Sequence, residues 1–135
     1  LWNKKALLED LNELKISPED VDIIILTHNH YDHLGGIVLF PNAKVYGSKK
    51  DFGKNILNPK RLKIGGLKII ETPGHSRGGI CILYKNILFS GDTLFHRNTI
   101  GRTDLPGSSE EDMQKSLKKL SKIKYTTLCP GHGYD

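Results

Sequence analysis

The segment 27–33 has the highest density of potential metal ligands in the sequence. It reads Thr-His-Asn-His-Tyr-Asp-His, with three histidines and one aspartate within six positions. In an extended chain alternate side chains point to the same side, so His28 and His30 are expected to face one way. Asp32 can continue that direction, and His33 can turn away from it where a helix begins. The segment can therefore offer two separate sets of ligands.

Three further candidate ligands follow apolar runs through glycine-containing turns. His75 comes after Thr-Pro-Gly, Asp92 after Ser-Gly and His132 after Pro-Gly. Each lies just beyond the end of an expected strand, where α/β sheets commonly carry their functional sites. Imidazole and carboxylate ligands together suit zinc, iron or manganese, and ligand type alone does not choose among them.

Each of these residues also has a simpler explanation. A single histidine at a strand end is more often a polar surface group than a ligand, and Asp92 could be a turn-forming residue. The recurrence of such groups at several strand ends favours a metal site over unrelated surface residues. His96 differs because it fits no ligand spacing, and we interpret it as a loop or substrate-facing residue.

Hydrophobic periodicity predicts the elements that position these side chains. Leucines at helical spacing predict a helix over 4–14, and an acidic start after Ser108 or Ser109 predicts another that ends near residue 123. A short helix is expected over 33–39. The expected strands are 21–26, 43–46, 62–64, 67–72, 80–84, 87–89 and 126–129, with hairpin turns at 65–66 and 85–86. This mixture predicts a layered α/β domain over residues 1–135.

The composition restricts the class of partner. A chain of 135 residues suits one compact domain, and no apolar run approaches the ~20 residues of a membrane-spanning helix. The net charge of +5 comes from scattered lysines without interleaved aromatics, which argues against nucleic acid. Cys81 and Cys129 lie far apart in apolar runs, so we expect buried thiols in a reducing compartment. We therefore expect a cytoplasmic protein that binds neither nucleic acid nor membrane; its oligomeric state stays open.

The segment THNHYDHLGG resembles the HxHxDH signature of the metallo-β-lactamase superfamily, and TPGHS, SGDTLF and PGHG resemble its later metal-binding motifs in the same order. IGRTDLPG followed by an acidic helix start resembles the glyoxalase II-like, or hydroxyacylglutathione hydrolase-like, branch. The resemblance implies an αββα sandwich. Its usual N-terminal strands do not precede the helix at 4–14, and the sequence ends three residues after His132. We therefore expect a sandwich that is incomplete at the N-terminus, with its C-terminal end also missing.

The resemblance implies two divalent metal ions, with zinc as the first expectation and iron or manganese as alternatives. Asp32 would orient the nucleophile as well as bind metal, which makes it the expected catalytic residue. Arg102 and Tyr134 are the expected substrate-binding residues, although an Arg102–Asp104 pair within the loop is an equal alternative for Arg102. The implied ligands are His28, His30 and His75 for one metal, Asp32, His33 and His132 for the second, and Asp92 as the bridge between them.

The implied function is hydrolysis of a small-molecule thioester or ester by a hydroxide held between the two metals. The alternatives are an iron-dependent sulfur (persulfide) dioxygenase of the same fold, a nuclease of the same fold, and an incomplete chain that binds metal poorly. A flavodiiron protein would favour glutamate at the position of His30. The helical domain and the lysine and tyrosine loop with which glyoxalase II binds glutathione are not recognised, so the thiol part of the substrate is left open.

Overall fold

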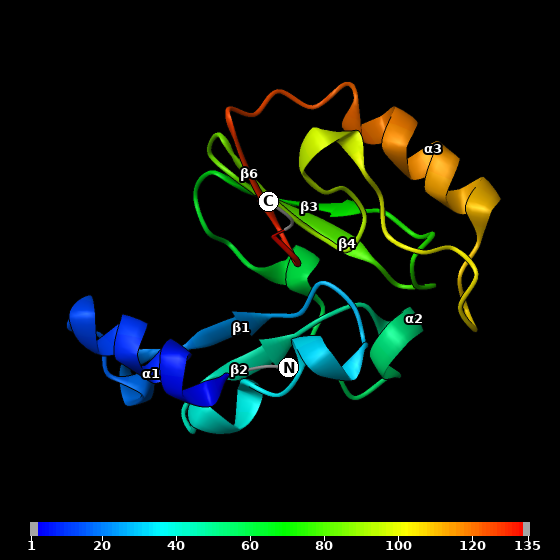
Figure 1. Ribbon diagram of the computed structural model, residues 1–135. Helices are drawn as coiled ribbons and strands as arrows, with labels where there is room; N and C mark the ends of the chain where they lie inside the picture. Colours follow the sequence, from blue (N-terminus) through cyan, green and yellow to red (C-terminus); the bar gives the residue numbers. More distant parts are fainter. Residues whose placement is uncertain (1–2, 134–135) are drawn as a thin grey trace.

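The computed structural model describes residues 3–133 and arranges them around two β-sheets, with helices beside them (Figure 1). Helix α1 (Lys4–Glu13) lies next to the smaller sheet, and helix α3 (Glu110–Leu120) lies along the larger one. This mixed α/β arrangement confirms the predicted fold class. Within the described residues, no helix is both long and apolar enough to cross a membrane.

The smaller sheet has two parallel strands, β1 (Ile23–Ile25) and β2 (Lys44–Tyr46), with Ile24 opposite Val45. Both strands were predicted with slightly longer bounds. The single helix predicted over 33–39 is wrong, because two 3₁₀ turns, Tyr31–His33 and Ile37–Leu39, replace it. Two adjacent glycines, each costing about 1 kcal/mol relative to alanine inside a helix, separate these turns.

The larger sheet brings the ends of three strands to one edge. β3 pairs antiparallel with β4, β4 antiparallel with β5, and β5 parallel with β6, so β3, β5 and β6 run in the same direction. The segments that follow these three strands carry His75, Asp92 and His132. The four strands span Leu67–Glu71 (β3), Ile80–Tyr84 (β4), Ile87–Gly91 (β5) and Thr127–Pro130 (β6).

The strand predicted over 62–64 is also wrong. β3 pairs along its whole length with β4, from Leu67 opposite Tyr84 to Glu71 opposite Ile80, and Ile64 remains 40% exposed. The Gly65–Gly66 turn therefore leads into β3 without closing a hairpin. The predicted hairpin between β4 and β5 is confirmed.

Helix α3 covers the larger sheet through one buried face. Ser109 caps it by accepting a hydrogen bond from the backbone N–H of Asp112, as its sequence predicted. Leu120 packs with core residues of β3, β4 and β5, namely Ile70, Cys81 and Leu88. Cys81 and Cys129 are both free thiols. The remaining elements are the short helix α2 (Lys49–Phe52), which was not predicted, and 3₁₀ turns at Pro18–Asp20, Pro59–Arg61 and His96–Asn98.

Candidate metal centre

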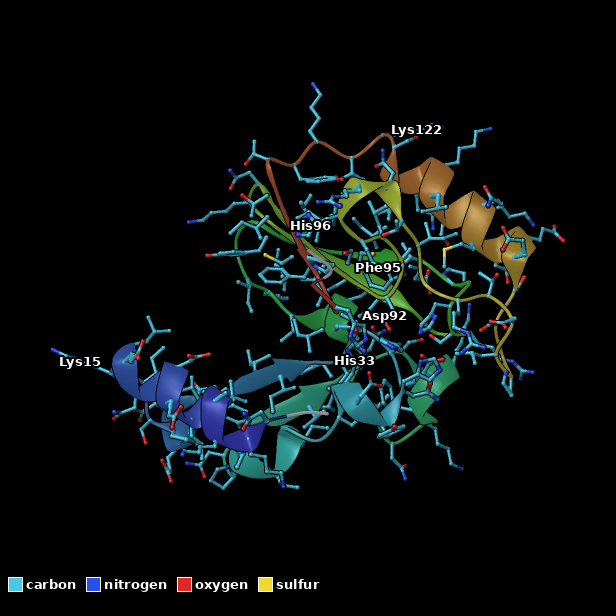
Figure 2. All side chains as sticks on the ribbon, viewed as in Figure 1. Lys15, His33, Asp92, Phe95, His96 and Lys122 are labelled. Carbon is cyan, nitrogen blue, oxygen red and sulfur yellow. The ribbon has the colours of Figure 1, made fainter. Side chains whose placement is uncertain are left out.

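The candidate ligands gather where the edge of the larger sheet faces the segment that follows β1. Figure 2 shows His33 and Asp92 close together between the two sheets, although 59 positions separate them in the sequence. A backbone hydrogen bond from Ile80 N–H to the Thr27 carbonyl oxygen, at 2.9 Å, joins the end of β1 to the start of β4. The two sheets are thus connected directly beside the cluster.

Three histidines form the first ligand group. Nδ1 of His30 lies 2.9 Å from Nε2 of His75, and one nitrogen of each of His28, His30 and His75 lies within 4.8 Å of the others. His28 and His75 are buried, with 2% and 7% of their surface exposed. These two histidines are therefore well shielded from solvent, whereas His30 is half-buried.

One carboxylate and two histidines form the second group. Nε2 of His33 lies 3.2 Å from Nε2 of His132. Oδ2 of Asp32 lies 3.4 Å from the His33 nitrogen and 3.3 Å from the His132 nitrogen. All three residues are half-buried, so this group is more open than the first.

The Asp92 carboxylate lies between the two groups. Its Oδ2 is 3.4 Å from Nε2 of His75 and 3.7 Å from Nε2 of His28, both in the first group. The same oxygen is 3.3 Å from Nε2 of His132, and Oδ1 is 3.3 Å from Nε2 of His33, both in the second group. One carboxylate therefore reaches both sets of nitrogens.

Hydrogen bonds on the far sides of two rings determine which nitrogens face the cluster. Nδ1 of His75 donates to the backbone carbonyl of Arg102 at 2.8 Å, which leaves Nε2 as the lone-pair nitrogen of the neutral ring. Nδ1 of His28 lies 3.0 Å from the Thr27 hydroxyl, and its Nε2 faces inward. Such partners are typical of metal-binding histidines, because they fix the tautomer and the ring orientation.

Two atoms of the cluster are buried without a hydrogen-bond partner among the described residues, Nε2 of His28 and Oδ1 of Asp92. An unsatisfied buried polar atom costs about 1–3 kcal/mol, so the arrangement needs a compensating interaction. A cation accepts lone pairs from both atom types. Ligands at ~2.0–2.1 Å from a tetrahedral zinc ion lie about 3.3 Å apart, which is close to the 3.2–3.4 Å separations within the second group. The residues thus fit divalent metal ions.

The ionisable groups of the cluster shift one another's pKa values. Burial lowers the pKa values of His33 and His75, but their contacts with Asp92 raise both above the ordinary value. Burial, assisted by the charge of His33, lowers the pKa of His28 to about 3, so its ring is neutral. Burial by itself would raise the pKa of Asp92, but its contacts with His33 and His75 hold it well below the ordinary value. The cluster therefore contains an anionic carboxylate and a neutral imidazole at neutral pH, both of which are competent ligands.

Two glycines allow other backbone segments to approach Asp92. A Cβ atom at Gly131 would lie 2.3 Å from Oδ1 of Asp92, and one at Gly101 would lie 1.9 Å from its carbonyl oxygen. Ser108 supports the neighbouring turn by donating its hydroxyl to the His75 carbonyl at 2.7 Å. Sequence reasoning did not identify these supporting residues, although Gly101 lies in the IGRTD segment that it did single out.

A cleft of about 490 Å³ opens beside the cluster, within the usual size range for small-molecule sites. Arg102 lines it, but its guanidinium forms two 2.9 Å hydrogen bonds with Asp104, as the alternative expectation proposed. The exposed His96 does not line it, and Tyr134 lies outside the described residues. The lining residues are His75, Asp92, Phe95, Thr99, Ile100, Gly101, Arg102 and His132.

The sequence matches the metallo-β-lactamase superfamily over residues 1–51 and 43–132. The chain therefore belongs to that superfamily. The superfamily binds divalent metals, zinc or iron, which agrees with the His and Asp cluster.

Individual relatives and a solved structure resemble the chain over nearly its whole length. A probable metallo-hydrolase of Methanocaldococcus jannaschii is 38% identical over 96% of this chain and 65% of its own. A hydroxyacylglutathione hydrolase of Serratia proteamaculans is 34% identical over 96% of this chain and 54% of its own. The crystal structure of a protein in a di-iron-bound form is 27% identical, with a TM-score of 0.78 over 98% of this chain and 78% of its own. The chain thus spans about half to two thirds of the length of these two curated relatives.

Proposed function

We propose that the protein is a metal-dependent hydrolase that cleaves a small thioester or ester, with His28, His30, His75, Asp32, His33, His132 and Asp92 as its ligands. The observation that carries the proposal is the position of Asp92, which lies between two ligand groups and has a buried oxygen that makes no hydrogen bond among residues 3–133. Zinc is the first expectation for the metal. The di-iron-bound form of a similar structure makes iron the second.

Bound divalent cations would supply hydroxide near neutral pH, because they lower the pKa of a coordinated water molecule. Asp92 contributes negative charge between the two groups, and its two oxygens contact nitrogens of both. Asp32 is the more exposed of the two carboxylates, with 36% of its side-chain surface exposed against 8% for Asp92, and its Oδ2 lies 3.3 Å from Nε2 of His132. In this proposal it orients the attacking water in addition to binding metal.

The cleft supports a small acyl group as the substrate portion beside the cluster. Phe95 and Ile100 give it apolar walls, and the guanidinium of Arg102 is neutralised by Asp104. Its remaining ionisable lining residues are themselves proposed ligands, so residues 3–133 supply no separate general acid there. A thioester has a good leaving group and does not need one, and the similarity to a hydroxyacylglutathione hydrolase supports this choice.

The test combines metal analysis with two activity assays on the full-length protein. Elemental analysis after reconstitution is expected to give close to two metals per chain. Thiol release from a panel of acyl-thioesters is measured beside oxygen uptake with glutathione persulfide, and only thiol release is expected. Oxygen uptake without thioester cleavage would establish the dioxygenase alternative, and absence of bound metal would overturn the proposal.

A matched pair of variants locates the site. Asp92→Ala is expected to lower activity and metal content together, because it removes the one carboxylate that reaches both groups. His96→Ala removes an exposed imidazole outside the cleft and is expected to change neither. An Asp92→Ala variant with full activity and both metals would show that the assignment is wrong.

A further inference from the structure

Asp51 contacts both loops that carry the first ligand group, although it is not a candidate ligand itself. It lies in helix α2, and its carboxylate accepts hydrogen bonds from the Ser76 hydroxyl at 2.7 Å and from the Gly78 backbone N–H at 2.6 Å. Its backbone carbonyl accepts a hydrogen bond from Nδ2 of Asn29 at 3.0 Å. One residue thus connects two segments that are far apart in the sequence.

The partners of Asp51 are direct neighbours of the first-group histidines. Asn29 lies between His28 and His30, and Ser76 follows His75. The spacing of these three histidines depends on how closely the two loops approach each other. Asp51 bonds to both loops, so its position bears directly on that spacing.

The packing around Asp51 leaves little room for adjustment. A Cβ atom at Gly78 would lie 2.7 Å from the backbone nitrogen of Asp51 and 2.8 Å from its Cγ. Ser76 is only 4% exposed, so water does not readily replace the carboxylate as the partner of its hydroxyl. Hydrogen bonds to an ionised carboxylate are about twice as strong as neutral ones.

We propose that Asp51 is a positioning residue that sets the spacing of His28, His30 and His75 by joining their two loops. The inference rests on the metal-binding part of the proposed function. Asp32 and His33 of the second group follow His28 and His30 on the same segment, and His132 lies on another. Among residues 3–133, however, the hydrogen bonds of Asp51 reach Asn29, Ser76 and Gly78, which lie beside the first-group histidines. Asp51 is therefore expected to affect the first metal position more strongly than the second.

Asp51→Asn tests this role with almost no change in shape. The asparagine oxygen can still accept from the Gly78 N–H, but its NH₂ group can only donate to the Ser76 hydroxyl, so both contacts lose the ionised acceptor that makes them strong. The backbone hydrogen bond between Ile80 and Thr27 still joins the two loops, so the loops should loosen without separating. Ser76→Ala removes one of the same hydrogen bonds from the other side and serves as an independent variant. Asp10→Asn makes the same chemical change on the exposed face of α1 and is the matched control.

The measurement is a zinc titration of the metal-free, full-length protein against a competing chelator, which yields a dissociation constant for each position. Loss of a supporting partner typically weakens metal binding about 10–100-fold, and we expect that weakening at one position in Asp51→Asn and Ser76→Ala. In a His132→Ala background, which disables the second group, Asp51→Asn should weaken the remaining metal by the same factor. In a His30→Ala background, which disables the first group, it should weaken the remaining metal by a much smaller factor.

Wild-type zinc affinity at both positions in Asp51→Asn and Ser76→Ala would overturn the inference, whatever their activity. Equal weakening of both positions, in parallel with a lowered unfolding temperature of the metal-free protein, would also overturn it, because that result indicates a general structural role. Two tightly bound metals without thioester cleavage in the wild type would instead refute the proposed reaction and leave the role of Asp51 intact. A wild-type protein that binds no zinc would overturn both.

Discussion

Gly101 offers a sharp test of how closely the candidate metal centre is packed. The Cβ atom of an alanine at this position would lie 1.9 Å from the backbone carbonyl oxygen of Asp92 and 3.0 Å from Nδ1 of His75. Real Cβ contacts are essentially never shorter than 3.0 Å, so the two segments must separate by about 1.1 Å, the difference between 1.9 and 3.0 Å. Gly101 does not have a positive φ, so the perturbation is purely steric.

The separation must displace a proposed ligand or its support. The clashing atom belongs to the backbone of Asp92 and cannot rotate away as a flexible side chain would. If the loop moves instead, it carries the Arg102 carbonyl away from Nδ1 of His75, which it meets at 2.8 Å. A misplacement of ~1 Å in an active site can cost about 100-fold in rate. We therefore expect Gly101→Ala to lower kcat/KM for a thioester about 100-fold and to reduce the metal content.

Gly65→Ala is the matched control, because a Cβ atom there has nothing within 4 Å and Gly65 also lacks a positive φ. Steady-state kinetics and elemental analysis of both variants, with far-UV circular dichroism as a check on folding, make the comparison. Wild-type kinetics and metal content in Gly101→Ala would refute the reasoning. That result would mean that the loop yields without disturbing Asp92 or His75.

Two further predictions concern the core of the larger sheet. Leu88→Ala removes a fully buried side chain and is expected to lower the free energy of unfolding by about 2–5 kcal/mol in urea titrations, while Leu14→Ala, at a 69% exposed position, should change it by less than about 0.5 kcal/mol. Burial raises the pKa of the Cys81 thiol to about 11, so mass spectrometry should find Cys81 alkylated much more slowly than the half-buried Cys129 at pH 8. Similar losses for both leucines, or rapid native labelling of Cys81, would contradict the described core.

The sequence predicted the strands before His75, Asp92 and His132 because strand patterning and glycine turns are local signals. It did not predict that β3, β5 and β6 run in the same direction, which depends on strand pairing. Two antiparallel pairings followed by a parallel one give that result. The three candidate ligands therefore come together because of the strand pairing, which the local sequence pattern does not encode.

The elements that the sequence misplaced are those determined by tertiary contacts. The segment 62–64 has strand-like composition, but β4 supplies the partner of β3. Helix α2 has only four residues, too few for a periodic signal, so Asp51 had no feature that marked it as a candidate. Its importance emerges only from hydrogen bonds to Ser76 and Gly78, which lie 25 and 27 positions away.

The same atoms that support the proposed chemistry weaken the metal-free fold. Among the described residues, Nε2 of His28 and Oδ1 of Asp92 are buried without hydrogen-bond partners. Each costs about 1–3 kcal/mol, against a typical domain stability of about 5–15 kcal/mol. Thr27 and the Arg102 carbonyl bond the outer nitrogens of the rings and keep the inner nitrogens directed at the cluster. These hydrogen bonds thus fix the orientation of the two imidazole rings without a bound cation. A cation that binds there recovers the lost free energy, so metal binding and folding are coupled through these atoms.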